Sequence, residues 1–293
     1  DLRKSVSSLQ RRPRLVFSMT SKYRRGFDIT RDSLRVFTRE PSLILLPVLS
    51  LLAVGSAFAV LAAIVFQQGL VESLVTNDLY QYGALFCAIA ISSSVATFFN
   101  AAVVHCAAQL FDGNSTSVRD GLAAAWRARR QIAVWAVVAA TLGTVLYILD
   151  EKFGVVGSLT RAVFNLAWAL LTFFIVPVIV LDQRRSLRRQ LRRSGSLFRD
   201  TWGESVSATI GVSFVFLLVA LPGVTLGAVG YFVLDGMLAT GALVGGGGIV
   251  VAAIVGSQTA SAIARTALYR YATTGEGVGP FEDRDPDTVF PES

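Results

Sequence analysis

The side chains of this sequence that could do chemistry gather in one uncharged stretch, residues 87–111. This stretch contains a run of three serines at 92–94 and the only histidine, His105. A serine nucleophile needs a base within hydrogen-bond reach. The serines and His105 are 11–13 residues apart, which is more than three turns of one helix. The spacing therefore argues against nucleophilic catalysis by this pair.

Other catalytic arrangements are also missing from the sequence. The long uncharged runs contain no Asp or Glu, and there is neither a nucleotide-binding loop nor a cluster of His and Cys. Cys87 and Cys106 would lie about 28 Å apart in one straight helix, too far for a disulfide. We therefore expect no enzymatic activity, no catalytic residue, no cofactor and no metal.

The same stretch contains a polar stripe, because Ser93, Thr97 and Asn100 are spaced i, i+4 and i+7. Asn165 lies in a similar context, "VFNLA" against "FFNAA". Two interpretations remain open. The stripe forms hydrogen bonds between helices, or it is an intramembrane site for a small solute or a lipid headgroup in a transporter or channel.

The composition indicates a polytopic membrane protein. The 293 residues are 53% hydrophobic and 16% charged, and the mean hydropathy is +0.57. About 20 apolar residues in a helix cross a bilayer. Six uncharged runs approach or exceed that length: 42–68, 79–111, 131–149, 162–181, 205–234 and 236–264.

The basic residues divide unequally among the segments between these runs. Of the 27 Lys and Arg, 25 lie in the N-terminal segment, the connections 112–130 and 182–204, and the end of the last run with its tail. The other connections contain only Lys152 and Arg161. Cytoplasmic loops retain Lys and Arg. The pattern predicts six spans in three hairpins, with both termini cytoplasmic, in the plasma or inner membrane.

The connection "RRSLRRQLRRSGSLFRDTW" (184–202) has the pattern of an amphipathic interfacial helix. Leu187, Leu191, Phe198 and Trp202 share one face, which we expect to meet acyl chains. The arginines cover another arc, apart from Arg184 at the very start of the segment. The arginines that we expect to bind anionic lipid are Arg184, Arg185, Arg188, Arg189, Arg192 and Arg193. No nucleic-acid fold signature accompanies them, so no nucleic-acid partner is predicted.

Similar amphipathic patterns occur at 29–40, with Asp28 as N-cap, and at 115–130, with Ser115 or Ser117 as N-cap. They would give three units of interfacial helix and hairpin. The last two runs contain GxxxG pairs, which favour close helix packing. They are Gly223 with Gly227 and Gly241 with Gly245. An alternative is that Pro222 with Gly223, and the run of four glycines at 245–248, mark broken helices near a transport path.

Five stretches carry a resemblance to a known family: "GFDITRDSLRVFTREPSLILLPVLS" (26–50), "FFNAAVV" (98–104), "AWALLTFFIVPVIVLD" (167–182), "RSGSLFRDTWGE" (193–204) and "ALYRYATTGEGVGPFE" (267–282). The chain resembles an uncharacterised family of prokaryotic, largely archaeal, six-span membrane proteins, a domain of unknown function. The resemblance implies a six-helix architecture and a native start near Met19. It implies no catalytic residue, cofactor or substrate.

These observations predict an all-α polytopic membrane protein in three parts. Residues 1–26 form a basic extension without a fold, 27–273 the six-helix transmembrane domain with its cytoplasmic amphipathic helices, and 274–293 an acidic tail. Residues 1–18 are either an upstream extension or a genuine basic tail. The expected function is structural or accessory, with membrane lipids, preferentially anionic, as partners, together with further copies of the chain or subunits of a membrane complex. A transporter or channel for a small solute or lipid is the alternative.

Overall fold

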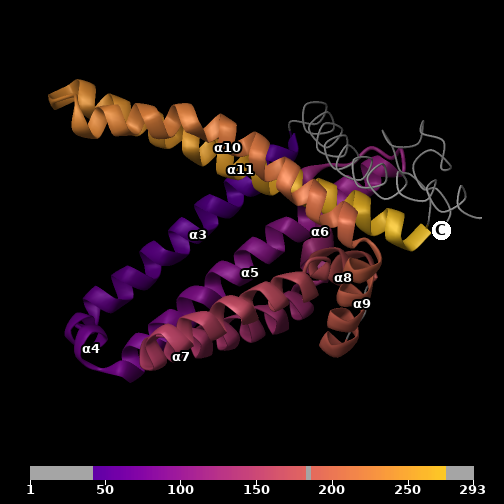
Figure 1. Ribbon diagram of the computed structural model, residues 1–293, viewed down its shortest axis with the longest axis horizontal. Coiled ribbons are helices and arrows are strands. Elements are labelled where there is room, and N and C mark those ends of the chain that lie inside the picture. Colours follow the sequence, from indigo (N-terminus) through magenta and orange to yellow (C-terminus); the bar gives the residue numbers. More distant parts are fainter. Residues whose placement is uncertain (1–41, 183–185, 275–293) are drawn as a thin grey trace, which may run out of the picture. The chain divides into compact units, whose positions relative to one another are not determined.

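The computed structural model describes residues 42–182 and 186–274, in which all secondary structure is helical (Figure 1). By length and composition, five helical segments in this part of the chain could cross a membrane. They are Leu45–Gln67, Asp78–Phe111, Arg129–Leu181, Thr209–Phe232 and Gly236–Thr274. The described residues divide into two compact units, 201–264 and the remainder. The predicted amphipathic segment 29–40 lies outside the described residues.

The larger unit begins with two long apolar helices, α3 (Ser42–Gln67) and α5 (Asp78–Phe111), joined by the short α4 (Val71–Thr76). Gly69 follows α3 with φ of 65°, a conformation that glycine adopts without strain. Asn77 caps α5 by accepting a hydrogen bond of 2.9 Å from the backbone N–H of Leu79. The two helices coincide with the first two uncharged runs of the sequence.

Helix α6 (Val118–Arg127) follows α5 and packs tightly against it. Ser117 and Asp120 form a reciprocal capping box at its start. Gly121 lies so close to α5 that a Cβ atom at this position would be 2.7 Å from Cys106 Sγ and 2.9 Å from the carbonyl oxygen of Ala102. The buried face of α6 therefore consists of small residues, Gly121, Ala124 and Ala125.

Helix α7 (Arg129–Leu171) reverses direction at Gly154, whose φ of 54° and ψ of −127° are not helical. The rings of Trp135 and Trp168 stack with centroids 5.5 Å apart. In a straight helix these 33 residues would separate them by about 50 Å. Arg161 also donates a hydrogen bond of 2.6 Å to Asp150 across the reversal. The two arms of α7 therefore lie against each other.

A break at 172–174 separates α7 from α8 (Ile175–Leu181). Pro177 follows the break, and because proline has no N–H it cannot donate to the carbonyl of Phe173. Helix α9 (Leu187–Asp200) then packs on both α7 and α8. The core of this unit includes Phe174 and Val178, both fully buried, together with the second half of α5.

The end of α11 (Gly236–Thr274), from residue 265 onward, belongs to this unit. Arg270 makes a bidentate ion pair with Asp112, at the end of α5. The ring of Tyr269 lies 6.4 Å from that of Phe174. The guanidinium of Arg265 lies over the ring of Phe173 at 5.0 Å. These contacts tie residues 265–274 to α5 and to the break before α8.

The smaller unit consists of α10 (Trp202–Phe232) and residues 236–264 of α11. Gly236, the first residue of α11, has φ of 61°. The helices approach at glycines, because a Cβ on Gly246 would lie 2.5 Å from the carbonyl oxygen of Gly223 and 2.7 Å from the backbone nitrogen of Gly227. Backbone meets backbone at this point, so no side chain larger than hydrogen fits at position 246.

Candidate functional site

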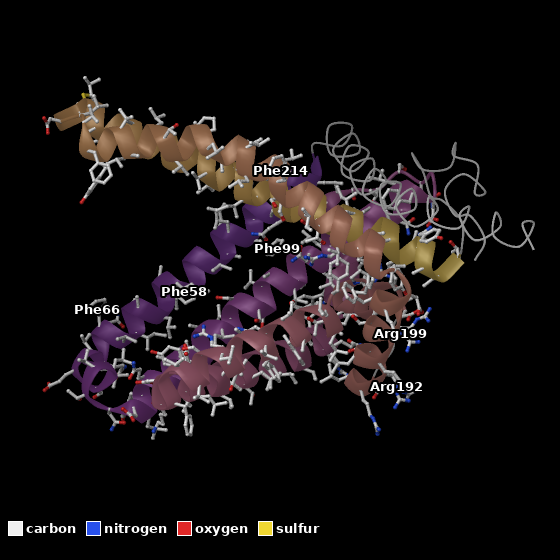
Figure 2. All side chains as sticks on the ribbon, in the orientation of Figure 1. Phe58, Phe66, Phe99, Arg192, Arg199 and Phe214 are labelled. Atoms are coloured by element: carbon white, nitrogen blue, oxygen red, sulfur yellow. The ribbon has the colours of Figure 1, made fainter. Side chains whose placement is uncertain are left out.

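The arginine-rich connection forms α9, and its arginines fall on the outer face of the helix. Within its described residues, Arg188, Arg189, Arg192 and Arg199 are exposed. Arg193 is half-buried, with its Nε 3.6 Å from Oδ2 of Asp182. Figure 2 shows Arg192 and Arg199 pointing away from the rest of the helix. Arg184 and Arg185 lie outside the described residues.

The inner face of α9 is fixed to the break between α7 and α8. Ser194 Oγ accepts a hydrogen bond of 3.0 Å from the backbone N–H of Phe174, and this bond is buried. The ring of Phe198 lies 5.2 Å from that of Phe173. Gly195 faces Leu171 so closely that a Cβ atom would be 2.8 Å from its Cδ1. The position of α9 is therefore set by contacts with protein.

These contacts change the role of the apolar face. The sequence predicts that Leu187, Leu191, Phe198 and Trp202 meet acyl chains, but the buried residues of α9 are Gln190, Ser194, Leu197 and Phe198, which lie against protein. Leu187 and Leu191 are half-buried. The face is rotated toward Ser194 because that hydroxyl satisfies the backbone N–H left unpaired at the helix break. Helical periodicity alone could not find this partner.

The outer face of α9 concentrates positive charge. Arg188 and Arg192 are four residues apart and Arg189 is adjacent, so like charges repel along this face. The nearest carboxylate on the same helix is at its end, where Arg199 Nε lies 3.7 Å from Oδ1 of the exposed Asp200. Phosphate groups would relieve this repulsion, because the planar guanidinium suits bidentate phosphate binding.

The structure places the polar stripe of α5 along one side of that helix. Thr97 is buried, whereas Ser93 and Asn100 are half-buried. Asn165 is exposed on the second arm of α7. Within the described residues, no side-chain hydrogen bond joins Asn100 to Asn165 or to the rest of the stripe.

The four glycines of the predicted GxxxG pairs have different surroundings. Gly223 lies against Gly246, and the backbone of Gly227 lies beside Gly246 as well. A Cβ on Gly241 would meet nothing within 4 Å, and one on Gly245 would make an ordinary contact of 3.6 Å with Leu226. Among the glycines of α11, the closest approach to the backbone of α10 is at Gly246, a position that the GxxxG spacing does not single out.

Two basic residues have roles that charge counting does not reveal. In the sequence, Arg265 and Arg270 count only as part of the positive-inside pattern. In the structure, Arg270 forms an ion pair with Asp112 and Arg265 lies over the ring of Phe173. Their partners are more than 90 residues away along the chain, so no local sequence signal identifies them. Among the described residues, no group of three His, Cys, Asp or Glu side chains could hold a metal ion.

Comparison with known proteins identifies the family of the chain, and the function of this family is unknown. The family described as "Family of unknown function (DUF6159)" matches residues 79–279, which is more than half of the chain. The matched region begins in α5 and ends beyond α11, so it includes α9. No curated protein and no solved structure matches the chain.

Proposed function

Since the chain belongs to a family of unknown function, DUF6159, we propose from its own residues that it is a non-enzymatic integral membrane protein that binds anionic lipid. It acts in a structural or accessory role, alone or with further copies and partner subunits. The exposed arginines of α9 are the lipid-binding residues. The protein resides in the plasma or inner membrane with both termini in the cytoplasm.

The reversal at Gly154 supports six crossings in three hairpins. The segment Arg129–Leu181 is one continuous candidate span by composition. Its 53 residues would be far longer than a bilayer crossing if straight. The stacking of Trp135 on Trp168 supports one crossing by each arm of α7, with Gly154 at the turn between them.

The charge distribution supports a cytoplasmic position for α9. With six crossings, Lys152 and Arg161 are the only basic residues in the outer connections, and Arg161 is paired with Asp150. The other 25 basic residues fall on the inner side. That distribution is what the positive-inside rule predicts for a membrane protein.

The observation that carries the proposal is the combination of a fixed inner face and an arginine-bearing outer face on α9. Because Ser194 and Phe198 hold the helix against protein, Arg188, Arg189 and Arg192 keep one orientation. Each basic residue near an anionic leaflet contributes about 1 kcal/mol. Three prepositioned arginines give at most about 3 kcal/mol of preference for anionic over neutral lipid.

Thermal unfolding of the full chain in neutral detergent tests this proposal. Phosphatidylglycerol and phosphatidylcholine of equal chain length are added, and stabilisation by bound lipid follows RT ln(1 + [L]/Kd). We expect greater stabilisation by phosphatidylglycerol, and we expect salt to weaken it. Replacing Arg188, Arg189 and Arg192 by Gln should remove the difference.

The matched control removes the same charge elsewhere, at the exposed Arg127, Arg129 and Arg130. This variant should retain most of the preference for phosphatidylglycerol. Equal stabilisation of the wild type by both lipids would contradict the proposal. An α9 variant that responds like the wild type would also contradict it.

A transport function is the second candidate, and Asn100 is the observation that favours it. Its amide is half-buried in a candidate span and has no side-chain hydrogen bond within the described residues. A thermal-shift screen of small solutes and lipids on the wild type and on Asn100→Leu tests this candidate. A solute site predicts a compound that stabilises the wild type but not the variant. Stabilisation that survives the substitution, or no stabilising compound at all, removes Asn100 as a solute site.

A further inference from the structure

An apolar groove runs between α3, α5 and α6 within the larger unit. It is shallow and widely open to its surroundings, with a volume of about 930 Å³. Leu49, Leu52 and Ser56 line it from α3, at helical spacing, and Phe98 and Phe99 line it from α5. Figure 2 labels Phe99 on α5. The groove therefore follows two helices that could each cross a membrane.

The third wall is the outward face of α6. Leu122, Ala123 and Trp126 line the groove, whereas the opposite face of α6 is buried on α5 through Gly121. Because small residues make that buried contact, the large apolar side chains of α6 remain outside. Trp126 is 61% exposed and Leu52 is 64% exposed. In a membrane, surfaces of this kind lie against acyl chains, and tryptophan favours the interface.

One charged residue, Arg119, lines the groove. It is in the first turn of α6, seven residues before Trp126. The neighbouring carboxylate of Asp120 accepts hydrogen bonds from Ser117 Oγ at 2.6 Å and from Ser117 N–H at 3.1 Å. That carboxylate is engaged at the helix cap, and Arg119 has no ion pair among the described residues. Its guanidinium remains able to bind an anion.

We propose that this groove binds one anionic phospholipid, with its phosphate at Arg119 and an acyl chain along α3 and α5. The proposal rests on the membrane location put forward above, but not on lipid binding by α9. The groove is apolar and has one cation, Arg119, among its lining residues. Its chemistry therefore matches that of an amphiphile with an apolar chain and one negative headgroup. A purely apolar protein helix would cover the groove but would supply no anion to Arg119.

The position of Trp126 provides a fluorescence test. The other three tryptophans, Trp135, Trp168 and Trp202, are replaced by Phe in the full chain, and cooperative thermal unfolding verifies that this parent protein is folded. The protein is reconstituted into bilayers in which phosphatidylglycerol or phosphatidylcholine carries brominated acyl chains. Bromine quenches tryptophan emission at short range, so quenching reports which lipid occupies the groove.

We expect brominated phosphatidylglycerol to quench Trp126 with about fivefold higher relative affinity than brominated phosphatidylcholine. This corresponds to about 1 kcal/mol for one basic residue, converted at 1.4 kcal/mol per factor of ten. Arg119→Gln should abolish the preference. Gln at Arg188, Arg189 and Arg192 should leave it unchanged, so failure of the α9 proposal and failure of this one are distinguishable.

Three results would overturn the proposal. Equal quenching of the parent protein by both lipids would make the groove a site for unselected lipid. A preference that survives Arg119→Gln would separate the arginine from the lipid. Quenching by neither lipid would mean that another helix, from this chain or a second copy, covers the groove.

If the tryptophan substitutions prevent folding, a phosphatidylglycerol with a photoreactive acyl chain replaces fluorescence in the otherwise unmodified protein. Crosslinks on α3, α5 and the outward face of α6 that are lost in Arg119→Gln support the proposal. Crosslinks that spread evenly over the apolar helices in both proteins contradict it.

Discussion

Replacing Gly246 by Ala tests the packing of α10 against α11 with a single methyl group. A Cβ at position 246 would lie 2.5 Å from the carbonyl oxygen of Gly223 and 2.7 Å from the nitrogen of Gly227. Both are backbone atoms, so no change of rotamer can relieve the contact. The two helices must separate locally to accept the methyl group.

The adjacent Gly247 is the matched control, because a Cβ there would meet nothing within 4 Å. Gly→Ala in a helix gains up to about 1 kcal/mol of helix propensity at both positions. At Gly246 this gain is offset by an overpacking cost of about 1–3 kcal/mol. Gly246→Ala should therefore be less stable than Gly247→Ala by about 1–3 kcal/mol.

Thermal unfolding of both variants in the same detergent measures the difference. One kcal/mol corresponds to about 2–4 °C for a domain of 150–250 residues, so Gly246→Ala should unfold several degrees below Gly247→Ala. The unfolding temperature of the wild type does not affect this comparison between the two variants. If the two variants unfold at the same temperature, the backbone contact between Gly223 and Gly246 is not formed and the account of this packing is wrong.

Two further predictions concern other local features. Gly154→Ala should lower the stability by about 1–3 kcal/mol, because the φ of Gly154 is positive. The control, Gly55→Ala, should be neutral or stabilising, since a Cβ at Gly55 would meet nothing within 4 Å. Equal unfolding temperatures of the two variants would contradict the reversal at Gly154. The hydrogen bonds from Ser117 lower the pKa of Asp120. The charged cap therefore stabilises the protein fully at pH values above the usual Asp pKa of about 3.9. This stabilisation is lost as the pH falls through the lowered pKa. In a pH series of unfolding temperatures, Asp120→Asn should be less stable than the wild type at neutral pH, and the gap should close in acid; a gap that persists unchanged there would exclude the charged cap.

Much of the helical architecture could be predicted from hydropathy alone. The runs 42–68 and 79–111 correspond to α3 and α5 within one residue at either end, because uncharged apolar stretches of this length form continuous helices. The N-cap of α6 is Ser117, one of the two serines that the sequence allowed. Cys87 and Cys106 are both free, as their spacing predicted.

The sequence was less informative where two distant segments meet. The uncharged run at 162–181 has the length of one span, but the helix is interrupted at 172–174, before Pro177. At this interruption, Ser194 of α9 accepts a hydrogen bond from the backbone N–H of Phe174. The run was predicted as continuous because hydropathy contains no information on the N–H that Pro177 lacks. The rotation of α9 follows from the same contact.

The candidate sites show the same limit. Periodicity placed Arg188, Arg189 and Arg192 on one face of a helix, and they are exposed there. It could not associate Arg119 with Leu52 and Phe99, because the groove exists only once α3, α5 and α6 are packed. Spacing likewise could not single out Gly246 among the glycines of α11, since its partner lies on α10.

Cysteine accessibility at three positions tests the six-crossing topology and the cytoplasmic position of α9 together. In a protein with Cys87→Ser and Cys106→Ala, single cysteines replace Ser115, Val156 and Asp200, which are all exposed. A membrane-impermeant maleimide should label position 156 on intact cells, and positions 115 and 200 only after permeabilisation. Labelling that puts positions 115 and 200 on opposite sides would mean that residues 129–181 cross only once, and external labelling of position 200 would place the α9 arginines outside the cell.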